Sequence, residues 1–504
     1  MAGRLRQMTT PTPEPALDAP RLFERVRLLT IQPPGYAHSA AFAELIEGMA
    51  AAFAALGADV DMAVNQPLVG DGVNIVFGAH LIAAGVSLPG NAIIFNLEQL
   101  HSGMLVQPHY LELLRRHVVI DYSARNAALV REQTGNAHVH VLRVGYAASL
   151  TRIGNAAVQD VDVLFYGVVN ERRRRILDGL AAAGLSVRAL PGIYGKERDA
   201  WIARSKVVLN VHFYEDKIHE VVRTSYLLAN AKAVVSECDA QTEIDDHVRA
   251  ALVAVPYDAL VAECVALVRD DARRARVEQH ALAAFRNISQ SAALATLLPR
   301  LSATLPRRIN LGSGKAFDAE RLNIDIDAKW NPDVVANLCA PGGLRQIFFS
   351  RRFGLVRLDP GQFDEISTID VLEHIPDLAT MMTRCLDLLR VGGTMRIVVP
   401  YDLSWGAWQD PTHVRAFNER SWLYYTDWHW YLGWAEARFD MADMKMKLSP
   451  VGEAMLKRGI AHDEVFRTPR AVDEMQLVLV KRLLTEAEKE NTRKAQRGGG
   501  DAPA

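Results

Sequence analysis

The sequence has few cysteines and no long apolar run. Its four cysteines, Cys238, Cys264, Cys339 and Cys385, lie far apart and form no CxxC pair, so neither a zinc site nor a disulfide framework is indicated. Such a chain fits a reducing cytoplasm. The most apolar stretch, residues 81–97, is interrupted by glycine and proline, so no transmembrane helix is expected.

The sequence also lacks an excess of charge of one sign. The 504 residues carry a net charge of −2, which gives no indication of a nucleic-acid partner. Residues 1–21 have no apolar core of a secretory signal and are expected to form a disordered lead. Residues 484–504 are expected to form a frayed helix and a disordered tail. These features predict a cytoplasmic protein, either free or in peripheral contact with the inner face of the membrane.

Short apolar runs alternate along the chain with amphipathic or alanine-rich stretches. Residues 26–32 predict a strand and residues 40–57 a helix ending on glycine. This alternation is typical of α/β proteins. At about 150 residues per domain, the length predicts three domains. We place two Rossmann-like domains at 22–150 and 151–300 and a third at 305–483.

The third domain opens on the stretch INLGSGKAF. Gly312 and Gly314 form a G-x-G turn, in which the backbone can approach a ligand because no Cβ is in the way. The third glycine of the dinucleotide fingerprint is missing, which argues against a nicotinamide dehydrogenase. Asp325 ends the next predicted strand, where a carboxylate can bind both hydroxyls of a ribose.

The order of the motifs that follow is more specific. A third predicted strand ends at Asn337, FDEISTIDVLEHIPD supplies a fourth strand and a turn, and CLDLLRVGGTMRIVVP supplies a helix, a glycine turn and a fifth strand. In order and spacing, residues 307–402 resemble a class I S-adenosylmethionine-dependent methyltransferase. The family often has aspartate where this chain has Asn337, which keeps an acceptor for the adenine amine.

The resemblance implies a role for each motif. Gly312 and Gly314 would line the methionine part of S-adenosylmethionine, and Asp325 would bind its ribose. The adenine and the sulfonium would be flanked by Asn337, Asp370, Glu373 and His374.

The segment after the fifth strand carries candidate groups for the methyl acceptor. Asp410-Pro-Thr-His413 is followed by several aromatic residues, whose faces suit sugar rings. Methyl transfer to a hydroxyl needs placement and a base, and histidine suits proton removal. His413 is therefore either the base, near Asp410, or a structural hydrogen-bonder, and His374 is the rival base. No histidine and aspartate cluster has metal-ligand spacing, so no metal is expected.

Basic residues follow the first strand of the second domain. Gly167 lies in the turn after this strand, and Arg172 to Arg175 start the next helix, where positive charge opposes the helix macrodipole. A bound phosphate would offset that cost. The alternative is an arginine run that forms a solvated face.

The stretch LNVHFYEDKIHEVVRTSYLLANAKAVVSE places further charges near strand ends. Glu220 and Arg223 lie one turn apart on a predicted helix. Together, the first two domains resemble a retaining GT-B glycosyltransferase. The resemblance makes Glu220 the ribose ligand and Arg223 a diphosphate contact. The nucleotide-sugar side would comprise Gly167, Arg172, His212, Glu220, Arg223 and Glu237.

This part of the chain departs from the family in one respect. The second glutamate, about eight positions after the first, is missing because position 228 is leucine. A buried ion pair between Glu220 and Arg223 is the structural alternative to a ligand site. Residues 95–100 and 119–130 resemble the acceptor-side half of the same group, where Glu98 either acts as a base or caps the next helix.

The sequence therefore predicts a multidomain transferase. The first interpretation is a bifunctional glycosyltransferase and methyltransferase that acts on a glycan, free or lipid-linked, in bacterial surface polysaccharide biosynthesis. Its cofactor would be S-adenosylmethionine and its co-substrate a nucleotide-sugar. The alternative is a methyltransferase with a non-catalytic GT-B-like binding module. A scaffold with both sites inactive is the third interpretation.

Overall fold

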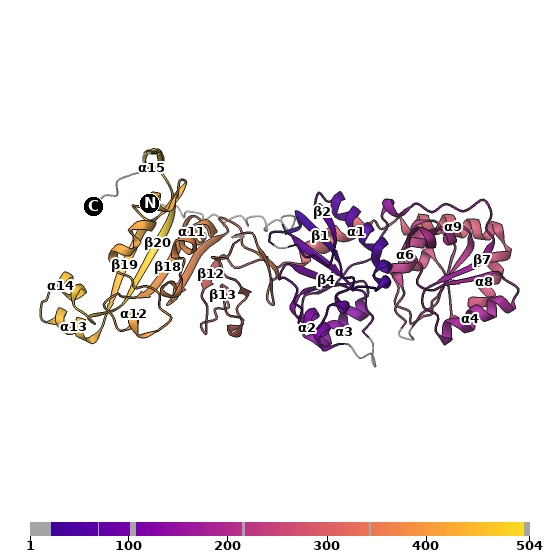
Figure 1. Cartoon of the computed structure of the whole chain (residues 1–504), viewed down its shortest axis with the longest axis horizontal. Helices are drawn as coiled ribbons and strands as arrows, with labels where there is room; N and C mark the ends of the chain where they lie inside the picture. Colours follow the sequence, from indigo (N-terminus) through magenta and orange to yellow (C-terminus); the bar gives the residue numbers. More distant parts are fainter. Residues whose placement is uncertain (1–21, 69, 101–106, 214–216, 342–343, 498–504) are drawn as a thin grey trace, which may run out of the picture. The chain divides into compact units, whose positions relative to one another are not determined.

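The structure, a computed structural model, describes residues 22–68, 70–100, 107–213, 217–341 and 344–497. The chain forms two compact units, Met1–Thr304 and Leu305–Ala504, each with its own sheets (Figure 1). Among the described residues, no helix combines the length and the apolar character needed to cross a membrane.

Unit 1 begins with a sheet of six parallel strands in the order β2-β1-β3-β4-β5-β6. All residues of β3 and β4 are buried, as expected for central strands of a parallel sheet. The helices are α1 (Ala43–Ala55), α2 (Pro108–Arg116) and α3 (Ala124–Thr134). The strands are β1 (Arg25–Thr30), β2 (Asp59–Val64), β3 (Val73–Phe77), β4 (Ala92–Asn96), β5 (Val118–Asp121) and β6 (Val139–Val141).

The second sheet of unit 1 has five parallel strands in the order β11-β10-β9-β7-β8. They are β7 (Val161–Tyr166), β8 (Val187–Leu190), β9 (Ser205–Asn210), β10 (Val234–Glu237) and β11 (Val253–Val255). The accompanying helices are α4 (Glu171–Ala182), α5 (Gly195–Ala203), α6 (Val221–Ala229), α7 (Asp246–Ala251), α8 (Leu260–Arg269) and α9 (Asp271–Phe285).

The end of unit 1 returns to its first half. Helix α10 (Gln290–Leu297) packs on α1, and Tyr146 forms a parallel bridge with Ser289. The buried Gln290 side chain accepts a hydrogen bond from the Gly145 N–H at 2.8 Å. Two parallel sheets, with a helix leading back from the second to the first, form the two Rossmann-like domains in GT-B arrangement that the sequence predicts.

Unit 2 contains a seven-stranded sheet in the order β14-β13-β12-β17-β18-β20-β19. Its first five strands are parallel, and β20 runs antiparallel to both β18 and β19. This is a Rossmann-like sheet of the kind expected for the methyltransferase domain. The strands are β12 (Arg308–Leu311), β13 (Leu322–Asp325), β14 (Val334–Val335), β17 (Phe363–Ile369), β18 (Leu389–Pro400), β19 (Ala437–Leu448) and β20 (Val472–Leu483).

Shorter elements surround this sheet. β15 (Ile347–Ser350) and β16 (Gly354–Arg357) form a separate antiparallel pair. The 3-10 helix η8 (Leu372–His374) follows β17, and the crossover from β12 to β13 has no helix, so the glycine loop is not followed by a helix N-terminus. The α-helices are α11 (Leu378–Leu388), α12 (Gly406–Gln409), α13 (Pro450–Lys457) and α14 (His462–Arg467).

The end of the chain, where a frayed helix and a tail are expected, contains a helix. Helix α15 (Glu486–Arg497) occupies most of it, and residues 498–504, like the expected lead 1–21, lie outside the described residues. The Thr485 N–H donates to Glu488 Oε2 at 2.8 Å, and the Glu488 N–H donates to Thr485 Oγ1 at 3.3 Å. This reciprocal capping box, together with the bond from Arg482 to Glu488 at 2.8 Å, stabilises the helix start.

Replacing Gln290 should weaken the return contact of α10. We expect Gln290→Leu to lower the free energy of unfolding of unit 1 by about 1–3 kcal/mol, because the buried Gly145 N–H loses its acceptor. Gln279→Leu, on the exposed side of α9, is the control and should stay within about 0.5 kcal/mol of the parent. Urea unfolding measures both, and equal stability of the two variants would contradict the prediction.

Candidate functional site

A cavity of about 430 Å³ lies within unit 1, where residues from its two halves meet. The first half contributes the loops after β4 and β5 and the start of α1, and the second half contributes the turn after β7 and parts of α5 and α6. Open α/β sheets bind ligands at these carboxyl ends of their strands. The charged lining residues are Glu44, Glu98, Arg173, Arg198, Glu220 and Arg223.

Glu220 is shared by two guanidinium groups on the cavity wall. Arg173 Nη2 donates to Glu220 Oε1 at 2.6 Å, and Arg223 Nη1 lies 2.7 Å from Oε2. Burial alone would raise the pKa of Glu220, but Arg223 and Arg173 outweigh it and lower that pKa. Burial lowers the pKa of the Arg173 guanidinium to about 10. Glu220 and Arg173 are thus charged near neutral pH, and the Glu220–Arg223 ion pair considered from the sequence is present.

Gly167 makes room for this cluster. Its φ is +130°, in the region that favours glycine, and a Cβ at this position would lie 2.9 Å from Arg223 Nη2. Any larger residue would therefore displace the Arg223 guanidinium from the cavity wall.

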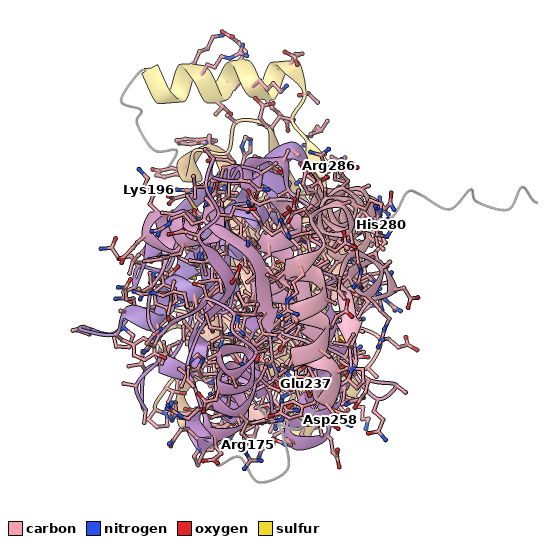
Figure 2. All side chains as sticks on the ribbon, turned by 90° about the vertical axis from the view of Figure 1, so that its right-hand side faces the viewer. Arg175, Lys196, Glu237, Asp258, His280 and Arg286 are labelled. Atoms are coloured by element: carbon pink, nitrogen blue, oxygen red, sulfur yellow. The ribbon has the colours of Figure 1, made fainter. Side chains whose placement is uncertain are left out.

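Arg172, His212 and Glu237 form a second group, which does not line the cavity. Both terminal nitrogens of Arg172 pair with the Glu237 carboxylate, and the backbone N–H of His212 donates to Glu237 Oε2 at 3.1 Å. Burial lowers the pKa of His212. Glu237 ends β10 and is labelled in Figure 2. The six residues predicted for a nucleotide-sugar are therefore divided between the cavity and this neighbouring ion pair.

The arginines at the start of α4 point in different directions. Arg175 is exposed at the lower edge of the view in Figure 2 and pairs with Glu171 at 3.3 Å. Arg173 points inward instead, three and four residues before the buried Ile176 and Leu177. Helical spacing therefore contains the signal for Arg173, although the sequence-based choice is Arg172.

Glu98 follows β4 and lines the cavity. Its Oε1 lies 3.4 Å from His80 Nδ1, and its backbone N–H donates to Asn96 Oδ1 at 3.1 Å. Helix α2 begins only at Pro108 and has no side-chain cap at Gln107, so Glu98 does not cap the next helix. Its role as a base remains a prediction.

A further ion pair on the cavity wall has no signal in the sequence. Arg198 on α5 donates to both carboxylate oxygens of Glu44 on α1, at 2.7 and 3.1 Å, and both side chains are buried. These residues are 154 positions apart in the chain. The pair joins the two halves of unit 1 beside the Glu220 cluster.

In unit 2, Asp325 holds the glycine loop after β12. Its Oδ2 accepts from the Gly314 N–H at 2.8 Å and its Oδ1 from the Asp327 N–H at 2.9 Å. Gly312 has φ +68°, and a Cβ there would overlap the side chain of Val371. Each Asp325 oxygen keeps a lone pair, so the carboxylate can still accept from a ligand.

Asn337 and Asp370 lie after β14 and β17, at the same edge of the sheet. Asn337 is exposed, and its Oδ1 accepts from the Cys339 N–H at 3.0 Å. Asp370 adopts φ +53°, which aspartate tolerates better than most residues. Burial raises the pKa of Asp370, and Glu474 adds to the effect.

Glu373, His374 and His413 come together beside this edge, each with a ligand atom within 4.8 Å of the others. His413 Nε2 lies 4.0 Å from Glu373 Oε1, and the two imidazole rings are 4.6 Å apart. The Val414 N–H donates to the Glu373 carbonyl at 2.9 Å, which holds the loop of His413 against η8. The structure thus brings both candidate bases into one cluster.

The carboxyl group of Glu373 is almost fully buried. Within the described part of the chain, neither of its oxygens has a hydrogen-bond partner. Burial raises the pKa of Glu373 to about 7, and Asp370 and Asp410 add to the effect. This is an unusual state for a buried polar group, since most such groups find a partner.

Asp410 supports the cluster without entering it. The Thr412 hydroxyl donates to Asp410 Oδ1 at 2.7 Å and lies 2.9 Å from His374 Nδ1. Trp405 and Trp408 are among the most exposed large side chains of unit 2, and His413 Nδ1 lies 3.1 Å from the carbonyl of Ala407 between them. The segment whose backbone contacts His413 therefore carries two exposed aromatic side chains.

Parts of the chain are similar to known proteins, although a scan of protein families finds no match. Three uncharacterized proteins of Acanthamoeba polyphaga mimivirus are similar: L138 is 28% identical over 213 residues, L140 28% over 184 and L137 30% over 160. These stretches cover 39%, 34% and 30% of this chain. They cover only 22%, 57% and 21% of the relatives' own lengths.

Among solved structures, HepE of Anabaena in complex with UDP and glucose is 13% identical over 54% of this chain and 98% of its own, with a TM-score of 0.39. WaaG, a glycosyltransferase involved in lipopolysaccharide biosynthesis, is 11% identical over 55% and 99%, with a TM-score of 0.37. A SAM-dependent methyltransferase from Archaeoglobus fulgidus is 15% identical over 38% and 91%, with a TM-score of 0.22. At these identities and TM-scores, the similarity does not assign a function to this chain.

Removing the charge of Glu220 should destabilise unit 1. We expect Glu220→Gln to lower the free energy of unfolding on the order of 3 kcal/mol, because the buried Arg173 guanidinium loses its counter-ion. Glu171→Gln, which removes the exposed partner of Arg175, should change it by no more than about 0.5 kcal/mol. Urea unfolding compares the two, and a Glu220→Gln variant as stable as the control would show that the cluster is not a structural ion pair.

Proposed function

We propose that the chain is a bifunctional transferase, a glycosyltransferase in unit 1 and an S-adenosylmethionine-dependent methyltransferase in unit 2. One observation carries the proposal: each unit gathers buried charged side chains at the carboxyl ends of its parallel strands, where such sheets bind ligands. Both activities would act on one glycan, free or lipid-linked, and we propose a bacterial surface polysaccharide as the substrate class.

In unit 1, the cavity would take the nucleotide-sugar. A diphosphate would compete with Glu220 for the guanidiniums of Arg173 and Arg223, because charge-assisted bonds to phosphate are strong. The released Glu220 carboxylate would then accept from the ribose hydroxyls. Gly167 would let the backbone approach the ligand, and Glu98 would face the acceptor as a base. Outside the cavity lining, an ion-paired group would stabilise the nucleotide-binding side. This group is Arg172, His212 and Glu237.

In unit 2, the glycine loop would take the methyl donor. Gly312 and Gly314 would line its methionine part, the free lone pairs of Asp325 would accept from its ribose hydroxyls, and Asn337 would bind its adenine. Asp370, Glu373 and His374 would flank adenine and sulfonium. When bound, S-adenosylmethionine supplies an electrophilic methyl group.

The histidine cluster would act on the acceptor. A sugar hydroxyl would lie beside His413 and His374, with its ring stacked on the exposed side chain of Trp408. As the hydroxyl oxygen takes the methyl group, the sulfur keeps the electron pair of the broken bond and the proton leaves the oxygen. His413 and His374 would receive or guide that proton, and Asp410 would orient His374 through Thr412. Joining both activities in one chain raises the effective concentration of the second site.

The alternative is a methyltransferase whose unit 1 only binds a glycan or nucleotide. Two observations favour it: position 228 is leucine, and Glu220 is already neutralised by two arginines. Calorimetry with S-adenosylmethionine, UDP and GDP separates the interpretations. Binding of S-adenosylmethionine alone would support the methyltransferase with a non-catalytic unit 1. Binding of none of the three ligands would support a scaffold with both sites inactive.

Removing Asp325 should abolish methyl-donor binding. In Asp325→Ala, S-adenosylmethionine loses its ribose contact and the glycine loop loses its anchor at Gly314, so we expect no binding by calorimetry. Binding of UDP or GDP should be unchanged. Asp443→Ala, at an exposed position of β19, is the control and should bind the methyl donor normally. Loss of both ligands in Asp325→Ala would mean that the sites are not separate.

Removing Arg223 should weaken nucleotide binding. We expect Arg223→Ala to reduce affinity for UDP or GDP by about 10- to 100-fold, the value of a lost hydrogen bond to a charged group. Affinity for S-adenosylmethionine should not change. Arg175→Ala removes the same charge from the exposed face of α4 and should leave nucleotide affinity intact. Equal affinities of the two variants would refute the assignment of the cavity.

A further inference from the structure

The cluster of Glu373, His374 and His413 has the composition of a metal site. We propose that it binds one divalent transition-metal ion, with the Glu373 carboxylate and the Nε2 atoms of His374 and His413 as protein ligands. Two imidazoles and one carboxylate suit Zn²⁺, Mn²⁺ and Fe²⁺ better than Mg²⁺, which prefers oxygen ligands alone. Nothing in the sequence spacing indicates it, because the ligands come from η8 and from the loop after α12.

The hydrogen bonds of the histidines select the nitrogen that faces a ligand. The Thr412 hydroxyl has one proton and donates it to Asp410 Oδ1 at 2.7 Å, so the 2.9 Å contact with His374 is a bond donated by Nδ1–H. His413 Nδ1 lies 3.1 Å from the Ala407 carbonyl, which can only accept. In its neutral form, each ring therefore carries its proton on Nδ1 and presents a lone pair on Nε2.

These outer contacts are of the kind that metal-bound histidines make. Such a histidine donates its other N–H to a carboxylate, a carbonyl or an intermediate group, which sets its tautomer and orientation. Ala407 does this for His413, and the Thr412–Asp410 pair does it for His374. The Nδ1 atom of each ring therefore has a hydrogen-bond partner outside the cluster.

The Glu373 carboxylate, on the inner side of the cluster, lacks a positive partner among the described residues. Glu373 is 1% exposed, and neither of its oxygens has a hydrogen-bond partner among the described residues. His413 Nε2, which lies 4.0 Å from Glu373 Oε1, carries a lone pair in this neutral tautomer and cannot donate. A buried carboxylate without a donor is costly, and a cation among the three ligand atoms removes that cost.

The role of the ion rests on the proposed methyl transfer, although its binding does not. A hydroxyl bound to the ion would have a lowered pKa, as metal-bound water does. Its proton would pass to water, because both Nε2 atoms would hold the metal. The oxygen would form the new bond to the methyl carbon while the carbon–sulfur bond breaks. The histidines would then be ligands, not bases.

The test measures metal binding by the full chain after treatment with a chelator. Titration with Mn²⁺, followed by electron paramagnetic resonance, and with Zn²⁺, followed by calorimetry, should give one site per chain, with Mg²⁺ much weaker. His413→Ala and Glu373→Gln should each lower affinity by more than about 100-fold, beyond the usual effect of an outer contact. The control, His462→Ala on α14, should bind as the parent does.

A second pair of variants keeps all three ligands. Thr412→Val should weaken binding by about 10- to 100-fold, because His374 loses the bond that sets its tautomer, and Thr412→Ser should restore it. Failure of the parent to bind Mn²⁺ and Zn²⁺ at millimolar concentration, or equal binding by His413→Ala, would overturn the proposal. S-adenosylmethionine calorimetry on the same samples tells the two claims apart: methyl donor without metal refutes only this site, and metal without methyl donor refutes only the proposed function.

Discussion

Parallel strands end at one edge of their sheet, and charged side chains at that edge lose water when the chain folds. Each of them then needs a partner, because a buried charge without one is strongly unfavourable. Unit 1 meets this need internally: Glu220 lies between Arg173 and Arg223, Glu44 pairs with Arg198, and Glu237 pairs with Arg172. The first two groups hold the cavity wall in place and keep its cations near the point where the two halves meet, and the Glu237–Arg172 pair lies outside the cavity lining.

The need to pair buried charges is met differently in the two units. A cluster that is neutralised from within responds to an anionic ligand by exchanging partners, which suits binding of a phosphate. In unit 2, Asp325 is satisfied by two backbone N–H groups, but Glu373 is not satisfied by the described residues. Unit 1 therefore presents arginines that can pair with an anionic ligand. Unit 2 presents a carboxylate and two imidazoles that can bind a cation.

The fold could largely be predicted from the sequence, because apolar runs and the glycine and alanine pattern are local signals. The strands of both parallel sheets in unit 1 lie where those runs predict them, and so do β12, β13 and β17. The capping box at Thr485 also has a local signal, a threonine three residues before a glutamate, which the prediction of a frayed helix did not use. The site is less predictable. The inward orientation of Arg173 depends on its position on the helix relative to Ile176 and Leu177. The Arg198–Glu44 pair and the contact of His374 with His413 depend on tertiary packing that no local pattern encodes.

The cluster in unit 2 also shows why residue type alone is not enough. A glutamate beside two histidines would ordinarily be read as a carboxylate hydrogen-bonded to an imidazole N–H. Here Nδ1 of each ring bonds outward, to Ala407 or to the Thr412–Asp410 pair, so neutral rings leave two Nε2 lone pairs and one carboxylate for the cluster. A single proton on Glu373 can bond to one of the two lone pairs, whereas one cation can bind all three groups. The outward hydrogen bonds, more than the ligand residues themselves, therefore distinguish a metal centre from a histidine base.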